Sequence, residues 1–126
     1  METGSVRELL VWQKTTKLVT EIYFLTRNFP DEELYGLTAH IRRAIASVAE
    51  NITEGYEQES PSEYIRFLRL SLKSLREFQE KLEIAFNFHY CDSSTFALFM
   101  AQSNEVSRLL FNLMYKIETE SHPPKQ

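Results

Sequence analysis

The feature of this sequence with the clearest potential for chemistry is a row of cations in its second half. Arg66, Arg69, Lys73 and Arg76 are separated by three, four and three residues, a spacing that places them on one side of a helix. At 100° per residue this basic ridge lies about 140° from the apolar stripe of the same segment, so it faces solvent or a partner. Aligned cations can bind phosphates, releasing about one counterion per contact.

The same residues are also compatible with an ordinary solvated helix surface. Opposite charges three or four residues apart on a helix pair with each other, and each pair contributes only a few tenths of a kcal/mol. Four such pairs are available: Glu63 with Arg66, Lys73 with Glu77, Arg76 with Glu80, and Glu77 with Lys81. The ridge is therefore either a phosphate-binding surface or a solvated face of ion pairs, and the residues alone leave both open.

A second polar group lies earlier in the chain. Arg42 and Arg43 are adjacent and therefore point in different directions from one helix. Arg43 begins a polar seam along the edge of the apolar stripe, which continues through Ser47, Glu50, Asn51 and Glu54. Such a seam can bind a polar ligand or hold a subunit interface, but it is more often a hydrogen-bonded network where helices cross. We expect the structural role.

Patterns typical of catalysis are weak. No histidine has a glutamate three residues before it, as di-iron bundles require. The run from His89 to Cys91 and Asp92 holds three metal-ligand types but lacks the second cluster of a zinc site. Neither a glycine-rich phosphate loop nor a recognisable nucleophile motif is present. We therefore expect no catalytic residues, metal or cofactor, and a protein that is not an enzyme.

Helix-breaking residues indicate the elements that must position these side chains. They fall at Gly4, Pro30, Gly36, Gly55, Pro61 and Pro123. No glycine or proline occurs between positions 62 and 122, so the polar cluster at 92–95 is the expected break in that stretch. Ser60 and Glu63, with Pro61 between them, are typical of a capped helix start. The predicted helices cover 8–28, 34–55, 62–89 and 95–119.

Apolar residues recur every three or four positions in all four segments, as in helices that cross at about 20°. In 62–89 this stripe contains Ile65, Leu68, Leu72, Leu75, Gln79, Leu82 and Phe86, with Gln79 as its polar exception. The connections are short, which favours antiparallel neighbours. The predicted fold class is all-α, an antiparallel up-down-up-down four-helix bundle over 8–119. A flexible N-terminus at 1–7 and a disordered C-terminal tail at 120–126 are expected to flank it.

Composition agrees with one globular domain. The chain has 126 residues, 43% of them hydrophobic, and only three glycines and four prolines, which argues against an all-β fold with many turns. The lone Cys91, the lack of a signal peptide and the lack of long apolar runs predict a cytoplasmic protein without a membrane segment. The net charge is −4, but the acidity is concentrated at 31–59, with seven acidic and two basic residues. A polyanion could therefore bind only a local surface.

The first and last predicted helices carry more apolar residues than one core stripe needs. Those outside the stripe include Leu10, Trp12, Val19, Tyr23, Phe24, Leu98, Met100, Leu109, Phe111, Met114 and Tyr115. A wide core band with partly exposed aromatics is one explanation. We favour the other, a second face that is buried in a homo-oligomer.

Several motifs in order resemble one known family. They are Val11–Lys14, Phe29–Thr38, Ile41–Ala44, Asn51–Gly55, Glu63–Leu68 and Ser74–Glu77. Over about residues 9–118 the chain resembles the 23S rRNA intervening-sequence protein family, also called the four-helix bundle protein family. The resemblance implies a cytoplasmic bacterial protein, an antiparallel four-helix bundle and assembly into five-subunit rings. It also implies kinship with the accessory variability protein of diversity-generating retroelements, a basic pentameric barrel linked to nucleic acid and a reverse transcriptase.

For the family itself the resemblance implies no enzymatic activity, and nucleic-acid binding is inferred from gene context. The positions that match its motifs imply a structural or interfacial polar seam of Trp12, Tyr35, Arg43, Asn51, Glu54 and Gly55. Three positions depart from the family pattern. Ala49 stands where proline is frequent, His40 where glutamine is common, and Lys73 where glycine is usual. Lys73 strengthens the basic ridge.

Together these observations predict a non-enzymatic homo-oligomer, a pentamer, that associates with RNA or DNA, or with a ribonucleoprotein, through the basic ridge of the third helix. The candidate nucleic-acid-binding residues are Arg42, Arg43, Arg66, Arg69, Lys73 and Arg76. The alternative is a protein-interaction scaffold that presents its surface to a protein partner and binds no nucleic acid. No cofactor and no membrane are expected as partners.

Overall fold

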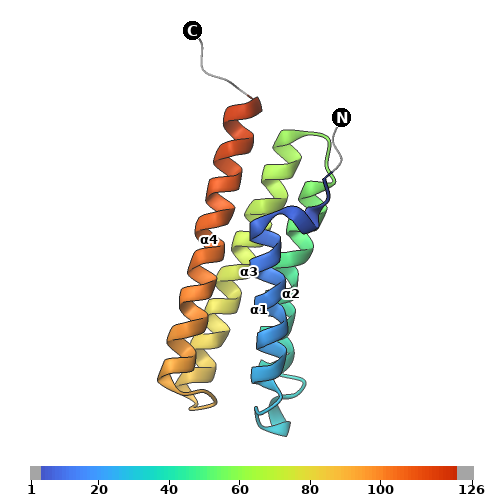
Figure 1. Ribbon diagram of the computed structural model, residues 1–126. Helices are drawn as coiled ribbons and strands as arrows, with labels where there is room; N and C mark the ends of the chain where they lie inside the picture. The colour runs from blue at the N-terminus through green and yellow to red at the C-terminus, as the bar shows by residue number, and fades with distance from the viewer. Residues whose placement is uncertain (1–3, 122–126) are drawn as a thin grey trace.

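The computed structural model describes residues 4–121 and contains four long helices that run alternately up and down (Figure 1). The elements are η1 (Val6–Glu8), α1 (Leu10–Thr26), η2 (Asp31–Glu33), α2 (Leu37–Tyr56), α3 (Pro61–Asn87) and α4 (Ser93–Ser121). The predicted fold class, an all-α antiparallel four-helix bundle, is confirmed. Among the described residues, none of the helices is both long enough and apolar enough to cross a lipid bilayer.

The predicted helix boundaries differ from the structure by one to three residues. The first helix begins at Leu10, because residues 6–8 form a separate 3-10 turn. The second begins at Leu37, since Asp31–Glu33 makes another such turn and Gly36 (φ −111°, ψ −110°) redirects the backbone. Helix α4 runs to Ser121, so positions 120–121 of the expected tail are helical. The expected segments 1–3 and 122–126 lie outside the described residues.

The core consists of the predicted stripes together with residues that the stripes missed. Leu18, Ile22, Ile41 and Leu110 are fully buried, as their spacing predicts. Phe78 is also fully buried, because α3 packs against both α2 and α4 and therefore buries a wider band than one stripe. Three other buried residues of α3 lie outside the predicted stripe: Ser71, Ser74 and Ala85.

Both ends of α3 are fixed by local chemistry. At its start the Ser60 hydroxyl accepts a hydrogen bond from the Glu63 backbone N–H at 3.4 Å, and Pro61 occupies the first position, as predicted. At its end the Tyr90 N–H donates to the Ala85 carbonyl and the His89 N–H to the Phe86 carbonyl, both at 2.9 Å. This is a Schellman cap, and His89 takes the left-handed conformation (φ 65°) that glycine usually fills.

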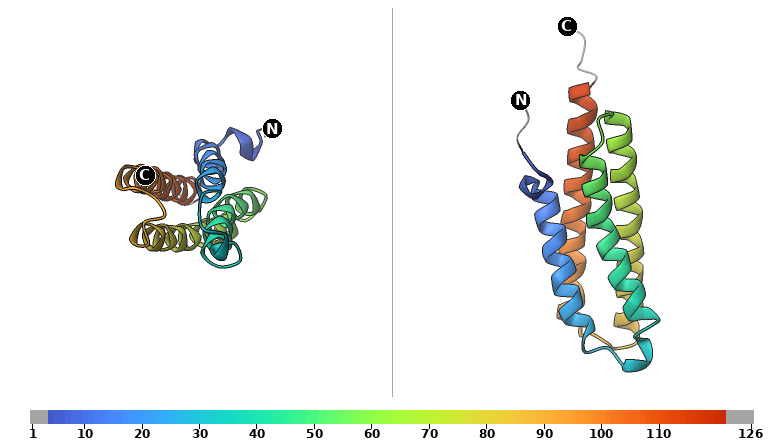
Figure 2. Two further views of the ribbon diagram at one scale, coloured as in Figure 1. Left: turned by 90° about the horizontal axis from the view of Figure 1, so that it is seen from below. Right: turned by 90° about the vertical axis from the view of Figure 1, so that its right-hand side faces the viewer.

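Helix α4 starts where the polar cluster predicted a break. The Asp92 carboxylate accepts a hydrogen bond from the Thr95 N–H at 2.8 Å, which caps the helix. That hydrogen bond also holds the pKa of Asp92 below its usual value. The view from below in Figure 2 shows α3 and α4 side by side, joined by this short turn.

Candidate nucleic-acid interface

The four residues of the basic ridge lie on the outer surface of α3, and all four are exposed. They do not form one uniform row. Arg69 and Arg76 lie on the side of α3 that faces α4, where both line a groove. Arg66 contacts Glu63 and Phe67 instead, and Lys73 lies between these two groups on the helix surface.

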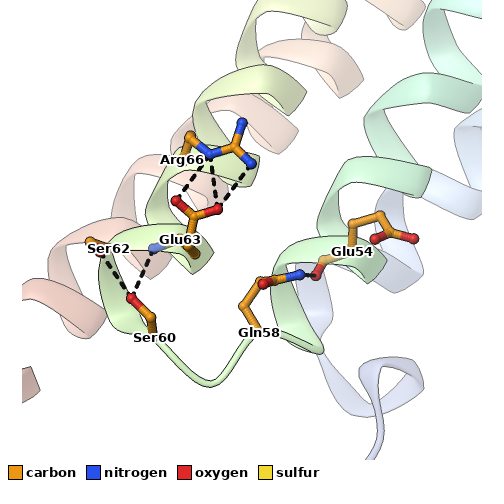
Figure 3. A network of polar contacts seen from close by, with 6 residues as sticks. All are labelled: Glu54, Gln58, Ser60, Ser62, Glu63 and Arg66. Atoms are coloured by element: carbon orange, nitrogen blue, oxygen red, sulfur yellow. Dashed lines mark hydrogen bonds and ion pairs between the residues drawn. The ribbon is translucent and has the colours of Figure 1, made fainter.

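Arg66 is held by its own helix. Its Nε and Nη2 donate to Oε1 of Glu63 at 3.0 and 2.9 Å (Figure 3). Its guanidinium also lies 4.6 Å from the ring centroid of Phe67. The hydrogen bond from Arg66 lowers the pKa of the Glu63 carboxyl, and the same contact raises the pKa of Arg66. A phosphate that approached Arg66 would have to compete with this carboxylate.

The other predicted ion pairs of α3 do not form. Within residues 4–121 the ion pairs are Arg66 with Glu63, and Lys14 with Glu105 at 3.2 Å. The expected pairs of Lys73 with Glu77, Arg76 with Glu80 and Glu77 with Lys81 were wrong. Lys73, Arg76, Glu77 and Glu80 are exposed, and an exposed ion pair gains little over the side-chain entropy that it costs. Arg69, Lys73 and Arg76 therefore present free charges.

A groove of about 530 Å³ runs between α3 and α4 beside these free charges. Its α3 wall carries Arg69 and Arg76 above the apolar Ile65 and Leu72, and its α4 wall is formed by Phe111, Met114, Tyr115 and Glu118. Phe111 is 53% exposed and Tyr115 72% exposed, so both rings are accessible to a ligand. The groove thus combines two cations, two accessible aromatic rings and one carboxylate.

From the sequence, Phe111, Met114 and Tyr115 were identified only as apolar residues outside the core stripe, and nothing in their spacing connected them with the basic ridge. Their position opposite Arg69 and Arg76 depends on the register between α3 and α4. Gln79 fixes that register, because its Nε2 donates to Ser103 Oγ at 2.8 Å and to Asn104 Oδ1 at 2.9 Å. Gln79 is the polar residue within the predicted apolar stripe of α3. This exception was the signal in the sequence that could have indicated a polar contact between α3 and α4.

The other two candidate cations lie elsewhere. Arg42 links α2 to α1. Its Nε donates to Thr26 Oγ1 at 2.7 Å, and its guanidinium lies 4.5 Å from the ring centroid of Tyr23. Arg43 is exposed and lines a different, polar groove between α2 and α3, together with His40, Ser47, Glu77, Glu80 and Lys81. The six candidate residues therefore do not converge on one surface of a single chain.

The predicted polar seam of α2 is divided as well. Asn51 Nδ2 donates to the Ser47 carbonyl at 2.9 Å, and the Ser47 hydroxyl lies 2.8 Å from that of Ser74 on α3. This part is the expected hydrogen-bonded network at a helix crossing. Glu50 and Glu54 point outward and are exposed.

Three further seam positions occupy separate places. Trp12 Nε1 donates to Thr53 Oγ1 at 3.1 Å and joins α1 to α2. Gly55 is buried against α3, whereas Tyr35 is 90% exposed ahead of α2 and makes no part of this network. Trp12 and Gly55 thus have structural roles within the chain.

Groups with altered acidity do not gather in a groove. Burial raises the pKa of Tyr64 to about 12 and raises the pKa of the Cys91 thiol, which leaves that thiol less nucleophilic. The hydrogen bond that Tyr90 donates to Glu33 (2.9 Å) raises the pKa of the Tyr90 hydroxyl. Within residues 4–121 no three His, Cys, Asp or Glu side chains are placed to hold a metal ion together.

Comparison with known proteins agrees with the fold and with the motifs. The family model of the 23S rRNA-intervening sequence protein matches residues 7–112. The chain belongs to this family. Among solved structures, it resembles a protein of unknown function from the S23 ribosomal protein family of Bacteroides thetaiotaomicron VPI-5482. The two are 22% identical, with a TM-score of 0.78 over 84% of this chain and 96% of that one. No curated protein matches the chain.

This intervening-sequence protein therefore shares its helical architecture with that protein of the S23 ribosomal protein family. At 22% identity the likeness concerns the fold, and the functional argument must come from the side chains of this chain.

Proposed function

We propose that this family member is a non-enzymatic, homo-oligomeric protein that associates with nucleic acid through the basic ridge of α3. The observation that carries the proposal is the set of three cations, Arg69, Lys73 and Arg76, that are exposed and lack any ion-pair partner within residues 4–121. Charges left free in this way are available to phosphates at no cost in broken contacts. The net charge of −4 confines the contact to this surface.

The homo-oligomer is supported by apolar side chains on the opposite edge of α4. Leu98 is 53% exposed and lies seven residues before Glu105, so it shares the edge of α4 that Glu105 marks by its ion pair with Lys14 of α1. Leu10 and Phe24 of α1 are similarly exposed. Burying such side chains against another copy removes apolar area from water. The family resemblance implies rings of five.

Light scattering coupled to size exclusion tests the assembly. A pentamer gives about 75 kDa, five times the 14.9 kDa of one chain. A mass of about 15 kDa at micromolar concentration would overturn the homo-oligomer.

Fluorescence anisotropy with a labelled single-stranded RNA tests the binding. If a strand contacts the three free cations of the ridge, the logarithm of its affinity falls with the logarithm of salt with a slope of about −2, which is about 20-fold between 50 and 200 mM. Arg69→Glu with Arg76→Glu should abolish binding at 50 mM salt. Lys17→Glu with Lys116→Glu, which changes net charge equally at exposed sites outside the ridge and groove, should weaken it far less. Equal effects of the two double variants, or no affinity of the unaltered protein, would contradict the role of the ridge.

The protein-interaction scaffold is the other outcome. Purification from the native cell with and without nuclease separates the two functions, because a protein partner of the scaffold is retained after nuclease treatment and a nucleic-acid-bridged partner is lost. A retained partner, together with no RNA affinity, would favour the scaffold.

A further inference from the structure

We propose that the groove between α3 and α4 binds unpaired nucleic acid, with bases stacked on Phe111 and Tyr115 and phosphates held by Arg69 and Arg76. This inference rests on the proposed function and adds the chemical class of the ligand, a single strand with accessible bases. The term base groove is used below for the surface lined by Ile65, Arg69, Leu72, Arg76, Phe111, Met114, Tyr115 and Glu118.

The aromatic rings are the first part of the argument. Phe111 and Tyr115 are four residues apart on α4, so they stand one above the other on the same face of the helix. Both are more than half exposed, although nearby apolar residues such as Leu110 are fully buried. Exposed rings beside cations provide the stacking surface and the charge that proteins use to bind single strands.

The arrangement of charge is the second part. Arg69 and Arg76 line the same groove as the rings, and neither has an ion-pair partner within residues 4–121. They are seven residues apart, about 10 Å along the helix axis. Glu118 is the carboxylate of the lining and also borders a smaller cavity with Arg69, Pro61 and Ser62. It repels phosphate at that end, so the Arg76 end is where a phosphate is best placed.

Shape excludes a duplex from the same contacts. Bases in a duplex stack on each other and expose only their edges in the grooves, so their faces cannot reach Phe111 or Tyr115. A duplex could still bind the outer ridge through its phosphates alone. The base groove therefore predicts a preference for single strands, whereas the ridge alone predicts none.

The rings lie away from the surface that we assign to self-association. Phe111 follows Asn104 by seven residues and so shares its edge of α4, which faces α3 because Asn104 accepts the hydrogen bond from Gln79. Leu98 and Glu105 share the other edge, toward α1. Oligomerisation through the α1 edge leaves the base groove open.

The test compares three labelled probes by anisotropy at 50 mM salt: a 12-nucleotide single-stranded oligoadenylate DNA, an abasic strand of the same length and charge, and a 12-base-pair duplex. The unaltered protein should bind the oligoadenylate at least about 5-fold more tightly than the abasic strand. Tyr115→Ala and Phe111→Ala should each remove most of that difference and leave affinity for the abasic strand unchanged. Phe88→Ala, an exposed ring just after the end of α3 and outside the groove, is the matched control and should change neither.

Equal affinity for the oligoadenylate and abasic strands would overturn the base groove and leave the ridge proposal intact, because phosphates alone would then account for binding. Failure to bind any of the three probes would overturn both. Loss of oligomeric mass in Tyr115→Ala, with its helical circular dichroism preserved, would show that a second copy covers the groove, and this too would overturn the proposal.

Discussion

Helix α3 is packed very differently on its two flanks. Toward α2 its residues are small or fit closely: the Ser71 hydroxyl donates to the Val48 carbonyl at 2.8 Å, and Ser74 meets Ser47. Toward α4, the half of α3 near Arg69 and Arg76 faces an open groove instead. Short side chains allow two helices to approach, whereas long and aromatic ones keep them apart. The close flank fixes the bundle, and the open flank leaves side chains free for a ligand.

Gly55 shows how close the first flank is. A Cβ added there would lie 3.0 Å from Phe67 Cβ and Tyr64 Cδ1, and 3.1 Å from the Tyr64 carbonyl oxygen. A side chain at this position would therefore require Tyr64 and Phe67 to shift by a few tenths of an ångström. On the open flank, α3 and α4 are in contact near the turn that joins them, where the rings of Phe86 and Phe96 stack with centroids 4.5 Å apart.

The largest difference between the flanks should appear when the same substitution is made on each. Phe78 is fully buried, so Phe78→Ala should lower the free energy of unfolding by about 3–5 kcal/mol. Phe111→Ala, on the open flank, should lower it by less than about 1 kcal/mol, because more than half of its ring is already in water. Urea unfolding followed by circular dichroism measures both. Equal losses would mean that Phe111 is buried in solution, as in a subunit contact.

The sequence predicted the close flank better than the open one. Helical periodicity identifies which residues of one helix are apolar, and so it found the buried stripe through Leu68, Leu75 and Leu82. Periodicity does not tell how wide a band is buried, and Phe78 was missed because α3 contacts two helices. Local signals served well at the helix ends, where Ser60 and Asp92 cap as their residue types predict.

The candidate site was only half predictable for a related reason. The ridge is a property of one helix, so spacing alone placed its four residues on a common outer surface. The base groove is a property of two helices, and it requires the register set by Gln79 with Ser103 and Asn104. Ion pairs were overestimated because suitable spacing permits a pair but does not overcome the entropy of exposed side chains.

A substitution at Gly55 should give the next largest effect. Gly55→Ala adds a Cβ that must displace Tyr64 and Phe67, which costs about 2–3 kcal/mol, and gains about 1 kcal/mol of helix propensity, for a net loss of about 1–2 kcal/mol. Ala101→Gly, at an exposed position in α4, is the matched control and should lose about 1 kcal/mol from propensity alone. Thermal unfolding of both variants is the measurement. If Gly55→Ala were more stable than the unaltered protein, α2 and α3 would not be in close contact there.

The smallest effect concerns the turn that joins α3 to α4. His89 adopts φ 65° at the position of a Schellman cap where glycine has no steric penalty. Relief of this steric strain in His89→Gly should therefore raise the free energy of unfolding by about 1 kcal/mol. The greater conformational freedom of glycine in the unfolded chain offsets part of that gain. Asn87→Gly, two residues earlier and still helical, should instead lower it by about 0.5–1 kcal/mol. Urea denaturation distinguishes these opposite signs, and a loss of stability in both variants would place the His89 side chain, rather than its backbone, in control of the turn. Affinity for the oligoadenylate strand should not change, because the base groove lies at the other end of α3.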